Sequence, residues 1–126
     1  MILKLFLILL CFPAFIFAQG GKAEPKRIEF QAGKTSAILT GRLSNGVEME
    51  YVFAAAKGQK VIVRNTQNSL FDFRVFNLKF DFETEFESSP DLTFEVPETG
   101  DYLLFIRKKM VAKPRNAQYV LTLSIK

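Results

Sequence analysis

The sequence contains no histidine, and its single cysteine, Cys11, lies within the first eighteen residues. Histidine is the commonest general base and the commonest metal ligand, and its absence excludes Ser-His and Cys-His catalytic relays. A chain that loses its first eighteen residues also has no thiol for nucleophilic catalysis, for a zinc site or for a disulfide. Its stability must come from packing, and most of its fourteen phenylalanines remain available for that.

Catalytic motifs that need neither histidine nor cysteine are also missing. The sequence has no Ser-x-x-Lys or Gly-x-Ser-x-Gly spacing and no glycine-rich phosphate loop. A glycosidase needs two carboxylates at a fixed separation, which a linear acidic run does not define. We therefore expect a binding protein rather than an enzyme, with no catalytic residue, no cofactor and no metal.

The N-terminus is typical of a secretory signal peptide. Lys4 precedes an apolar stretch from Leu5 to Phe12, and the small residue Ala18 ends the segment. The segment is short for a membrane span, and the leucine before Cys11 argues against a lipid anchor there.

Cleavage after Ala18 leaves 108 of the 126 residues, which is enough for one domain. We predict a signal peptide at 1–18, a flexible N-terminal segment at 19–26 and a single domain at 27–126. The mature protein is expected in the periplasm or the medium, with no membrane contact.

Along the rest of the chain, apolar residues alternate with polar ones. A period of two places every second side chain on one face of a β-strand, and helical spacing is nowhere sustained. The alternating residues are Ile28 and Phe30; Met49, Tyr51 and Phe53; Val61 and Val63; Phe71, Phe73 and Val75; Leu92, Phe94 and Val96; Tyr102, Leu104 and Ile106; and Tyr119, Leu121, Leu123 and Ile125. With turn residues between these runs, the pattern predicts an all-β, antiparallel, jelly-roll-like sandwich of about eight or nine strands.

Five residues in this pattern have structural interpretations. Gly41 lies within a predicted strand, where glycine marks a bulge or a close approach of backbones. Tyr51 and Tyr102 are in phase with apolar neighbours, which predicts core rings whose hydroxyls bond to turns. Asn45-Gly46 is typical of a tight hairpin turn, because both residues accept positive φ values.

The phase of the alternation changes after Val75, where the apolar positions switch from odd to even numbers. We therefore predict a strand at 70–76 and a loop or edge strand at 80–86. The alternating carboxylates beside it are Asp81, Glu83, Glu85 and Glu87. They would repel a second copy and so protect an edge; an irregular, weak calcium site in the run from Asp81 to Asp91 is the alternative.

Charge is segregated in the C-terminal half. From Asp81 to Asp101 there are eight carboxylates and no basic residue, and from Tyr102 to Lys126 there are six basic residues and no acidic one. Five basic residues fall within nine positions: Arg107, Lys108, Lys109, Lys113 and Arg115. This spacing predicts a cationic partner-binding loop, with a solvated hairpin tip as the alternative. Removing Lys4 from the seventeen basic residues leaves sixteen against thirteen acidic ones, and a net charge of +3 does not indicate nucleic acid.

Short motifs in both halves of the domain occur in an order found in one known family. They are Ile28-Glu29-Phe30, Ser36-Ala37, Thr40-Gly41-Arg42-Leu43, Tyr51-Val52-Phe53-Ala54, Lys57-Gly58-Gln59-Lys60-Val61, Pro97-Glu98-Thr99-Gly100-Asp101-Tyr102 and the closing Tyr119 to Lys126. Together they resemble the periplasmic inhibitors of g-type lysozyme, over Arg27 to Lys126. Bacterial pre-peptidase C-terminal domains, also β-sandwiches, share much of this pattern.

The resemblance implies that two loops, Ser44 to Val47 and Lys108 to Arg115, enter the substrate cleft of a lysozyme. A cation there can form a charge-assisted hydrogen bond with an essential carboxylate of the enzyme and block access of the sugar. The family's first loop arginine falls on Met110 and its second, after a gap, on Arg115; Lys113 is the other cationic candidate. The implied partner-binding residues are Asn45, Gly46, Val47, Lys108, Lys109, Met110, Lys113 and Arg115.

The oligomeric state is not defined by the sequence. For the function, we expect a secreted or periplasmic protein inhibitor of lysozyme, with g-type lysozyme favoured as the partner. The alternative is a stand-alone accessory module of the pre-peptidase C-terminal type, which binds carbohydrate or protein.

Overall fold

The structure is a computed structural model that describes residues 25–77, 79 and 81–126. The predicted signal peptide, with Cys11, lies outside these residues. The strands are β1 (Lys26–Arg27), β2 (Ser36–Ser44), β3 (Glu48–Ala55), β4 (Lys60–Asn65), β5 (Phe71–Asn77), β6 (Phe82–Glu83), β7 (Asp91–Glu95), β8 (Gly100–Lys108) and β9 (Asn116–Ile125). No helix long and apolar enough to cross a membrane occurs in this part of the chain.

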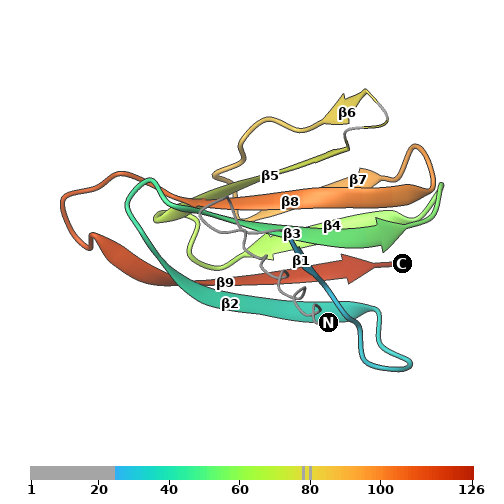
Figure 1. Cartoon of the computed structure of the whole chain (residues 1–126), viewed down its shortest axis with the longest axis horizontal. Coiled ribbons are helices and arrows are strands. Elements are labelled where there is room, and N and C mark those ends of the chain that lie inside the picture. The colour runs from blue at the N-terminus through green and yellow to red at the C-terminus, as the bar shows by residue number, and fades with distance from the viewer. Residues whose placement is uncertain (1–24, 78, 80) are drawn as a thin grey trace, which may run out of the picture.

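Two sheets face each other across one core (Figure 1). The first sheet has the order β1-β3-β8-β5-β6 and the second has the order β2-β9-β4-β7. All strand pairs are antiparallel except the short pair of β1 with β3, which is parallel. The predicted all-β sandwich is confirmed, with nine strands in the described residues.

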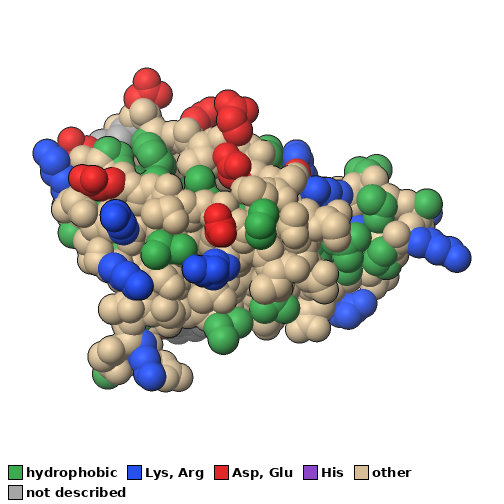
Figure 2. All heavy atoms as spheres, turned by 180° about the vertical axis from the view of Figure 1, so that it is seen from behind, with side chains coloured by type: hydrophobic (Ala, Val, Ile, Leu, Met, Phe, Trp, Pro, Cys, Tyr) green, Lys and Arg blue, Asp and Glu red, His purple; other side chains and the backbone are tan. Residues whose placement is uncertain are grey.

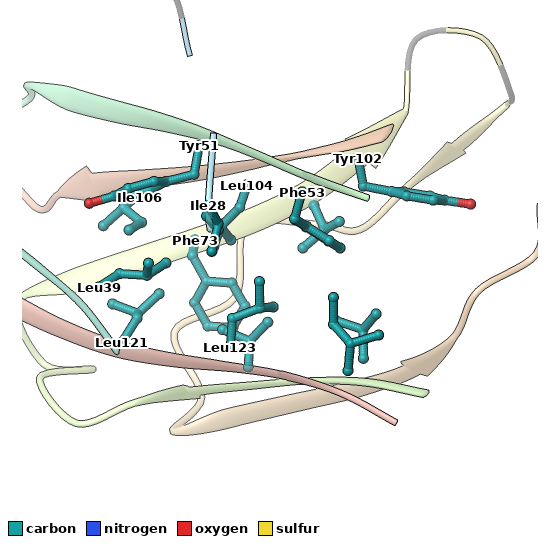
Figure 3. Packing of buried hydrophobic residues seen from close by; sticks show 14 of the residues in the cluster. Ile28, Leu39, Tyr51, Phe53, Phe73, Tyr102, Leu104, Ile106, Leu121 and Leu123 are labelled. Carbon is teal, nitrogen blue, oxygen red and sulfur yellow. The ribbon is translucent and has the colours of Figure 1, made fainter. Parts of the chain in front are cut away.

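The alternating apolar side chains form the core between the sheets (Figure 3). Tyr51 and Tyr102 lie in this core, as predicted, and their rings point in opposite directions. The Tyr102 hydroxyl donates to the Glu98 carbonyl at 2.6 Å, in the turn before β8. The Tyr51 hydroxyl instead lies 2.7 Å from the Tyr119 hydroxyl, so these two phenols bond to each other.

Gly41 in β2 leaves room for the ring of Tyr119, its partner in β9. A Cβ at this position would lie 2.6 Å from the Tyr119 hydroxyl oxygen and 2.9 Å from two ring carbons. The expected close approach is therefore made by a side chain and not by another backbone segment.

The first strand differs from the prediction. Pairing with β3 is confined to Lys26 and Arg27, so β1 begins one residue before the expected domain boundary and ends before Ile28 and Phe30. Ile28 is nevertheless buried, and its amide donates to the Val52 carbonyl at 2.9 Å. The chain then leaves the first sheet to reach β2 in the second, which is why the expected strand does not continue.

The phase change after Val75 has the predicted outcome. β5 corresponds to the strand expected at 70–76, and β6 is the expected edge strand at the margin of the first sheet. β5 is buried on both faces, because on its outer face Arg107 of β8 covers Asp72 and the Phe105 ring packs against Phe76. The segment after β6 continues along the free edge of β5, where Phe73 and Glu87 form a bridge. A strand covered on both faces cannot show a clean alternation.

Candidate functional site

Three loops that cross between the sheets lie at the same end of the sandwich. Residues 45–47 join β2 to β3, residues 66–70 join β4 to β5, and residues 109–115 join β8 to β9. We call this end the three-loop end; it is at the left in Figure 1 and at the right in Figure 2. Because each loop connects strands of different sheets, neither 45–47 nor 109–115 is the hairpin tip that the sequence suggested.

A buried lysine holds two of these loops together. Lys108, the last residue of β8, has a fully buried side chain. Its Nζ donates to Asn45 Oδ1 at 2.9 Å and to its neighbour's carbonyl, that of Lys109, at 2.9 Å. The prediction that Lys108 contacts a partner does not fit this burial. The alternation of Tyr102, Leu104 and Ile106 continues to position 108, and this is the signal that would have placed the side chain inside.

Asn45 makes further contacts with the loop 109–115. Its amide N–H donates to the Arg115 carbonyl at 2.8 Å, and its Nδ2 donates to the Val111 carbonyl at 2.7 Å. Gly46 follows with a φ of 76°, a conformation that favours glycine, and its amide donates to the Lys108 carbonyl at 3.0 Å. The loops 45–47 and 109–115 are therefore one hydrogen-bonded unit.

The third loop, 66–70, supports this unit from the other side. The Lys109 amide donates to the Leu70 carbonyl at 2.9 Å, and Lys109 Nζ donates to the Asn68 carbonyl at 3.0 Å. Asn65, buried at the start of the loop, donates from Nδ2 to the Phe71 carbonyl at 3.0 Å. The sequence indicated only a turn here; its place beside the basic loop depends on the sheet topology, which no local motif encodes.

The cationic block separates into structural and exposed residues. Arg107 binds both carboxylate oxygens of Asp72, at 3.1 Å and 3.0 Å, and this contact raises the pKa of Arg107. With Lys108 buried and Lys109 half-buried against Asn68, two cations of the block remain exposed at the tip, Lys113 and Arg115. Neither forms a salt bridge with another described residue.

Apolar side chains accompany these two cations. Met110 is 76% exposed and Val47 is 47% exposed, and the Met110 sulfur lies next to Gly46. Figure 2 shows hydrophobic and basic side chains together at this end, whereas the acidic ones gather along the upper side of the molecule. Exposed apolar groups bordered by cations suit a partner surface that is partly apolar and carries carboxylates.

The acidic run lies away from the three-loop end. Asp81, Glu83 and Glu85 are exposed on and around the edge strand β6, and Glu87 is half-buried. Among the described residues, no group of three or more acidic, histidine or cysteine side chains is placed to hold a metal ion.

Sequence comparison alone does not classify the chain, because no family model and no curated protein matches it. The fold and the site define a two-sheet β-sandwich with a cationic loop end, and solved structures share this fold. The periplasmic inhibitor of g-type lysozyme PliG from Salmonella Typhimurium matches with a TM-score of 0.68 and 24% identity, over 83% of this chain and 100% of PliG.

Two other solved structures extend the comparison. A mutant of PliG from Escherichia coli, likewise a periplasmic inhibitor of g-type lysozyme, matches with a TM-score of 0.65 and 25% identity, over 81% of this chain and 97% of that one. The pre-peptidase C-terminal domain of a Bacillus anthracis collagenase is more distant, with a TM-score of 0.56 and 16% identity over 86% of this chain and 100% of that one. The structural neighbours are therefore the two groups that the sequence resembles.

Proposed function

We propose that this chain is a secreted or periplasmic protein inhibitor of lysozyme, with g-type lysozyme as the favoured target. The observation that carries the proposal is the pair of exposed cations, Lys113 and Arg115, on a loop held by the buried Lys108 and Asn45. The similarity to the PliG inhibitors supports it, since the match extends over the full length of the Salmonella protein. Their periplasmic location and the predicted signal peptide support export.

In this proposal the loops 45–47 and 109–115 block the substrate cleft. Lys113 or Arg115 donates a charge-assisted hydrogen bond to a carboxylate of the enzyme. Glycoside hydrolases need such a carboxylate for catalysis. Met110 and Val47 pack against the cleft wall, and Asn45 and Gly46 keep the loop backbones in place. Because these backbones already bond to each other, little loop ordering opposes binding, which favours affinity.

The chain acts as a stoichiometric binder rather than a catalyst. A sequence without histidine, and without cysteine after position 18, lacks the commonest general base and a thiol nucleophile. The three-loop end supplies hydrogen-bond donation by exposed cations and burial of apolar surface. These interactions suit a protein that inhibits an enzyme by occupying its substrate cleft.

A second candidate is an accessory binding module of the pre-peptidase C-terminal type. One observation favours it: Phe76, Phe86 and Phe105 surround the Arg74 guanidinium on the outer face of the first sheet, at 4.7, 5.5 and 5.8 Å from their ring centres. Phe76 is buried, but the half-buried rings of Phe86 and Phe105 can contact the apolar face of a sugar. Such binding would not use the three-loop end.

Lysis of a peptidoglycan suspension distinguishes the two functions. The protein from Gln19 to Lys126 is titrated into g-type lysozyme, and other lysozyme types serve as controls. An inhibitor saturates near one-to-one stoichiometry, and g-type specificity restricts the effect to that enzyme. If no lysozyme is inhibited while the protein binds the peptidoglycan itself, the accessory module replaces the inhibitor as the function.

A further inference from the structure

The sandwich has four edge strands, and three of them are protected against pairing with another chain. β1 and β6 contain only two residues each, and carboxylates surround β6. β7 has five residues, begins with Asp91 and ends with Glu95, and lies between Pro90 and Pro97. Short length, charge and flanking proline are the usual means by which an edge is kept from pairing.

The fourth edge, β2, is the least protected of the four. It spans nine residues, Ser36–Ser44, without proline or carboxylate, and its one charged residue is Arg42. One side of β2 pairs with β9, and within the described part of the chain no strand pairs with its other side. In an antiparallel ladder every second residue directs its N–H and C=O away from the partner strand, so this side presents a row of backbone donors and acceptors.

The surface beside this edge has apolar side chains among polar ones. Ile38, on the outer face of β2, is 71% exposed, the most exposed aliphatic β-branched residue of the described chain. Between β2 and the segment that contains β1 lies a groove of about 330 Å³. Its lining includes the apolar Ile28 and Leu39, the Tyr51 ring of β3, and the charged Arg27 and Glu29. Figure 1 shows β2 at the lower margin of its sheet.

We propose that β2 pairs antiparallel with β2 of a second copy of this chain, around a two-fold axis at Thr40. In this register Thr40 lies opposite Thr40, Ile38 opposite Arg42, and Ser36 opposite Ser44 of the other copy. A threonine pair is a favourable cross-strand pair, the Arg42 stem can cover Ile38, and no two like charges lie opposite each other. The strand is thus complementary to itself, which a two-fold interface requires.

The dimer joins the two four-stranded sheets into one sheet of eight strands. Antiparallel pairing makes the two copies of β2 run in opposite directions, so the two three-loop ends point in opposite directions as well. Each end stays open to its own partner, and the inhibitory stoichiometry remains one enzyme per chain. The dimer goes beyond the proposed function and does not depend on it.

Sedimentation velocity tests the dimer. The protein concentration is varied from about 1 μM to about 1 mM, which covers weak to moderate dissociation constants. The wild-type protein from Gln19 to Lys126 is expected to shift towards twice the mass of one chain as concentration rises. Thr40→Lys, which places two lysines opposite each other, is expected to stay monomeric. The control is Thr93→Lys, at another exposed threonine, in the middle of β7, which should dimerise like the wild type.

A mixture tests the register. Thr40→Glu alone should also be monomeric, whereas an equimolar mixture of Thr40→Lys and Thr40→Glu should regain the dimer. Unchanged circular dichroism and unfolding temperature show that each variant is folded. A wild-type chain that is monomeric throughout, or a Thr40→Lys dimer, overturns the proposal; if the chain is monomeric and Thr40→Lys weakens lysozyme binding, the edge pairs with that enzyme instead.

Discussion

Lys108 Nζ lies 2.9 Å from Asn45 Oδ1, although the two residues are 63 positions apart in the sequence. Lys108 ends a strand of the first sheet, and Asn45 follows a strand of the second, so this bond joins the two sheets at the three-loop end. Asn45 in turn holds the loop 109–115 through Val111 and Arg115. The position of the exposed cations therefore depends on a buried one.

Replacing Lys108 with methionine keeps an unbranched side chain, one heavy atom shorter, and removes the Nζ donors. Loss of one partner leaves Asn45 Oδ1 and a backbone carbonyl without their donor, so we expect the free energy of unfolding to fall by about 1–3 kcal/mol. In a double-mutant cycle, Lys108→Met and Asn45→Ala should couple by about 0.5–3 kcal/mol. Urea denaturation measures both quantities, and strictly additive effects would show that the two residues act independently.

The exposed Lys57 provides the control for this cycle. Lys57→Met removes a lysine at the opposite end of the sandwich, and a surface substitution of this kind should change the free energy of unfolding by about 0.5 kcal/mol or less. A loss for Lys57→Met as large as that for Lys108→Met would mean that the effect comes from net charge and not from the buried contact.

Tyr119 should make stability fall at alkaline pH. Burial, together with the hydrogen bond to Tyr51, raises the pKa of the Tyr119 phenol above its ordinary value of 10.0. Below that value both states are protonated and the stability is intact. Above it the unfolded chain releases the proton while the folded chain keeps it, so the free energy of unfolding falls, by at most about 1.4 kcal/mol per pH unit.

Urea denaturation from neutral to alkaline pH, compared with Tyr119→Phe, isolates this contribution. The two proteins differ only at position 119, so the difference between the two curves reports Tyr119. We expect the variant to lose stability at neutral pH, because Tyr51 loses its partner, but to show a shallower alkaline decline. Parallel curves would mean that the phenol ionises as easily in the folded state as in the unfolded one.

Lysozyme binding should weaken as salt is added. The Debye length falls from about 30 Å at 0.01 M to about 8 Å at 0.15 M, so attraction by the exposed Lys113 and Arg115 is screened over this range. Calorimetric titration at several salt concentrations should give a lower affinity at high salt, mainly through slower association. Affinity that does not change with salt would assign the binding to Met110 and Val47 instead.

Much of the fold could be predicted because strand periodicity is a local property. The alternation around Tyr102 and Tyr119 identifies core strands, and the acidic alternation after Phe80 identifies an edge. Which sheet a strand joins is not local, so Asn45-Gly46 reads as a hairpin turn although its flanking strands lie in different sheets. The packing of Tyr119 against Gly41 could not be predicted for the same reason, because it depends on which strands are neighbours.

The candidate site was predictable as a region but not residue by residue. A block of like charge indicates a cationic loop. Whether each cation is buried or exposed depends on contacts with segments that are distant in the sequence. Asp72 engages Arg107, Asn68 engages Lys109, and Asn45 engages Lys108. Lys113 and Arg115 can be identified as the exposed cations only when the partners of the other three are known.

The most direct test is inhibition of g-type lysozyme by the variant Lys113→Ala/Arg115→Ala. A charge-assisted hydrogen bond contributes about 1.5–3 kcal/mol, so the double variant should inhibit about 10-fold to 150-fold less well while keeping its unfolding temperature. The variant Lys34→Ala/Lys57→Ala removes the same charge from exposed turns at the opposite end and should inhibit like the wild type. Full inhibition by the loop variant, or an equal loss in the control, would contradict the assignment of the three-loop end as the inhibitory site.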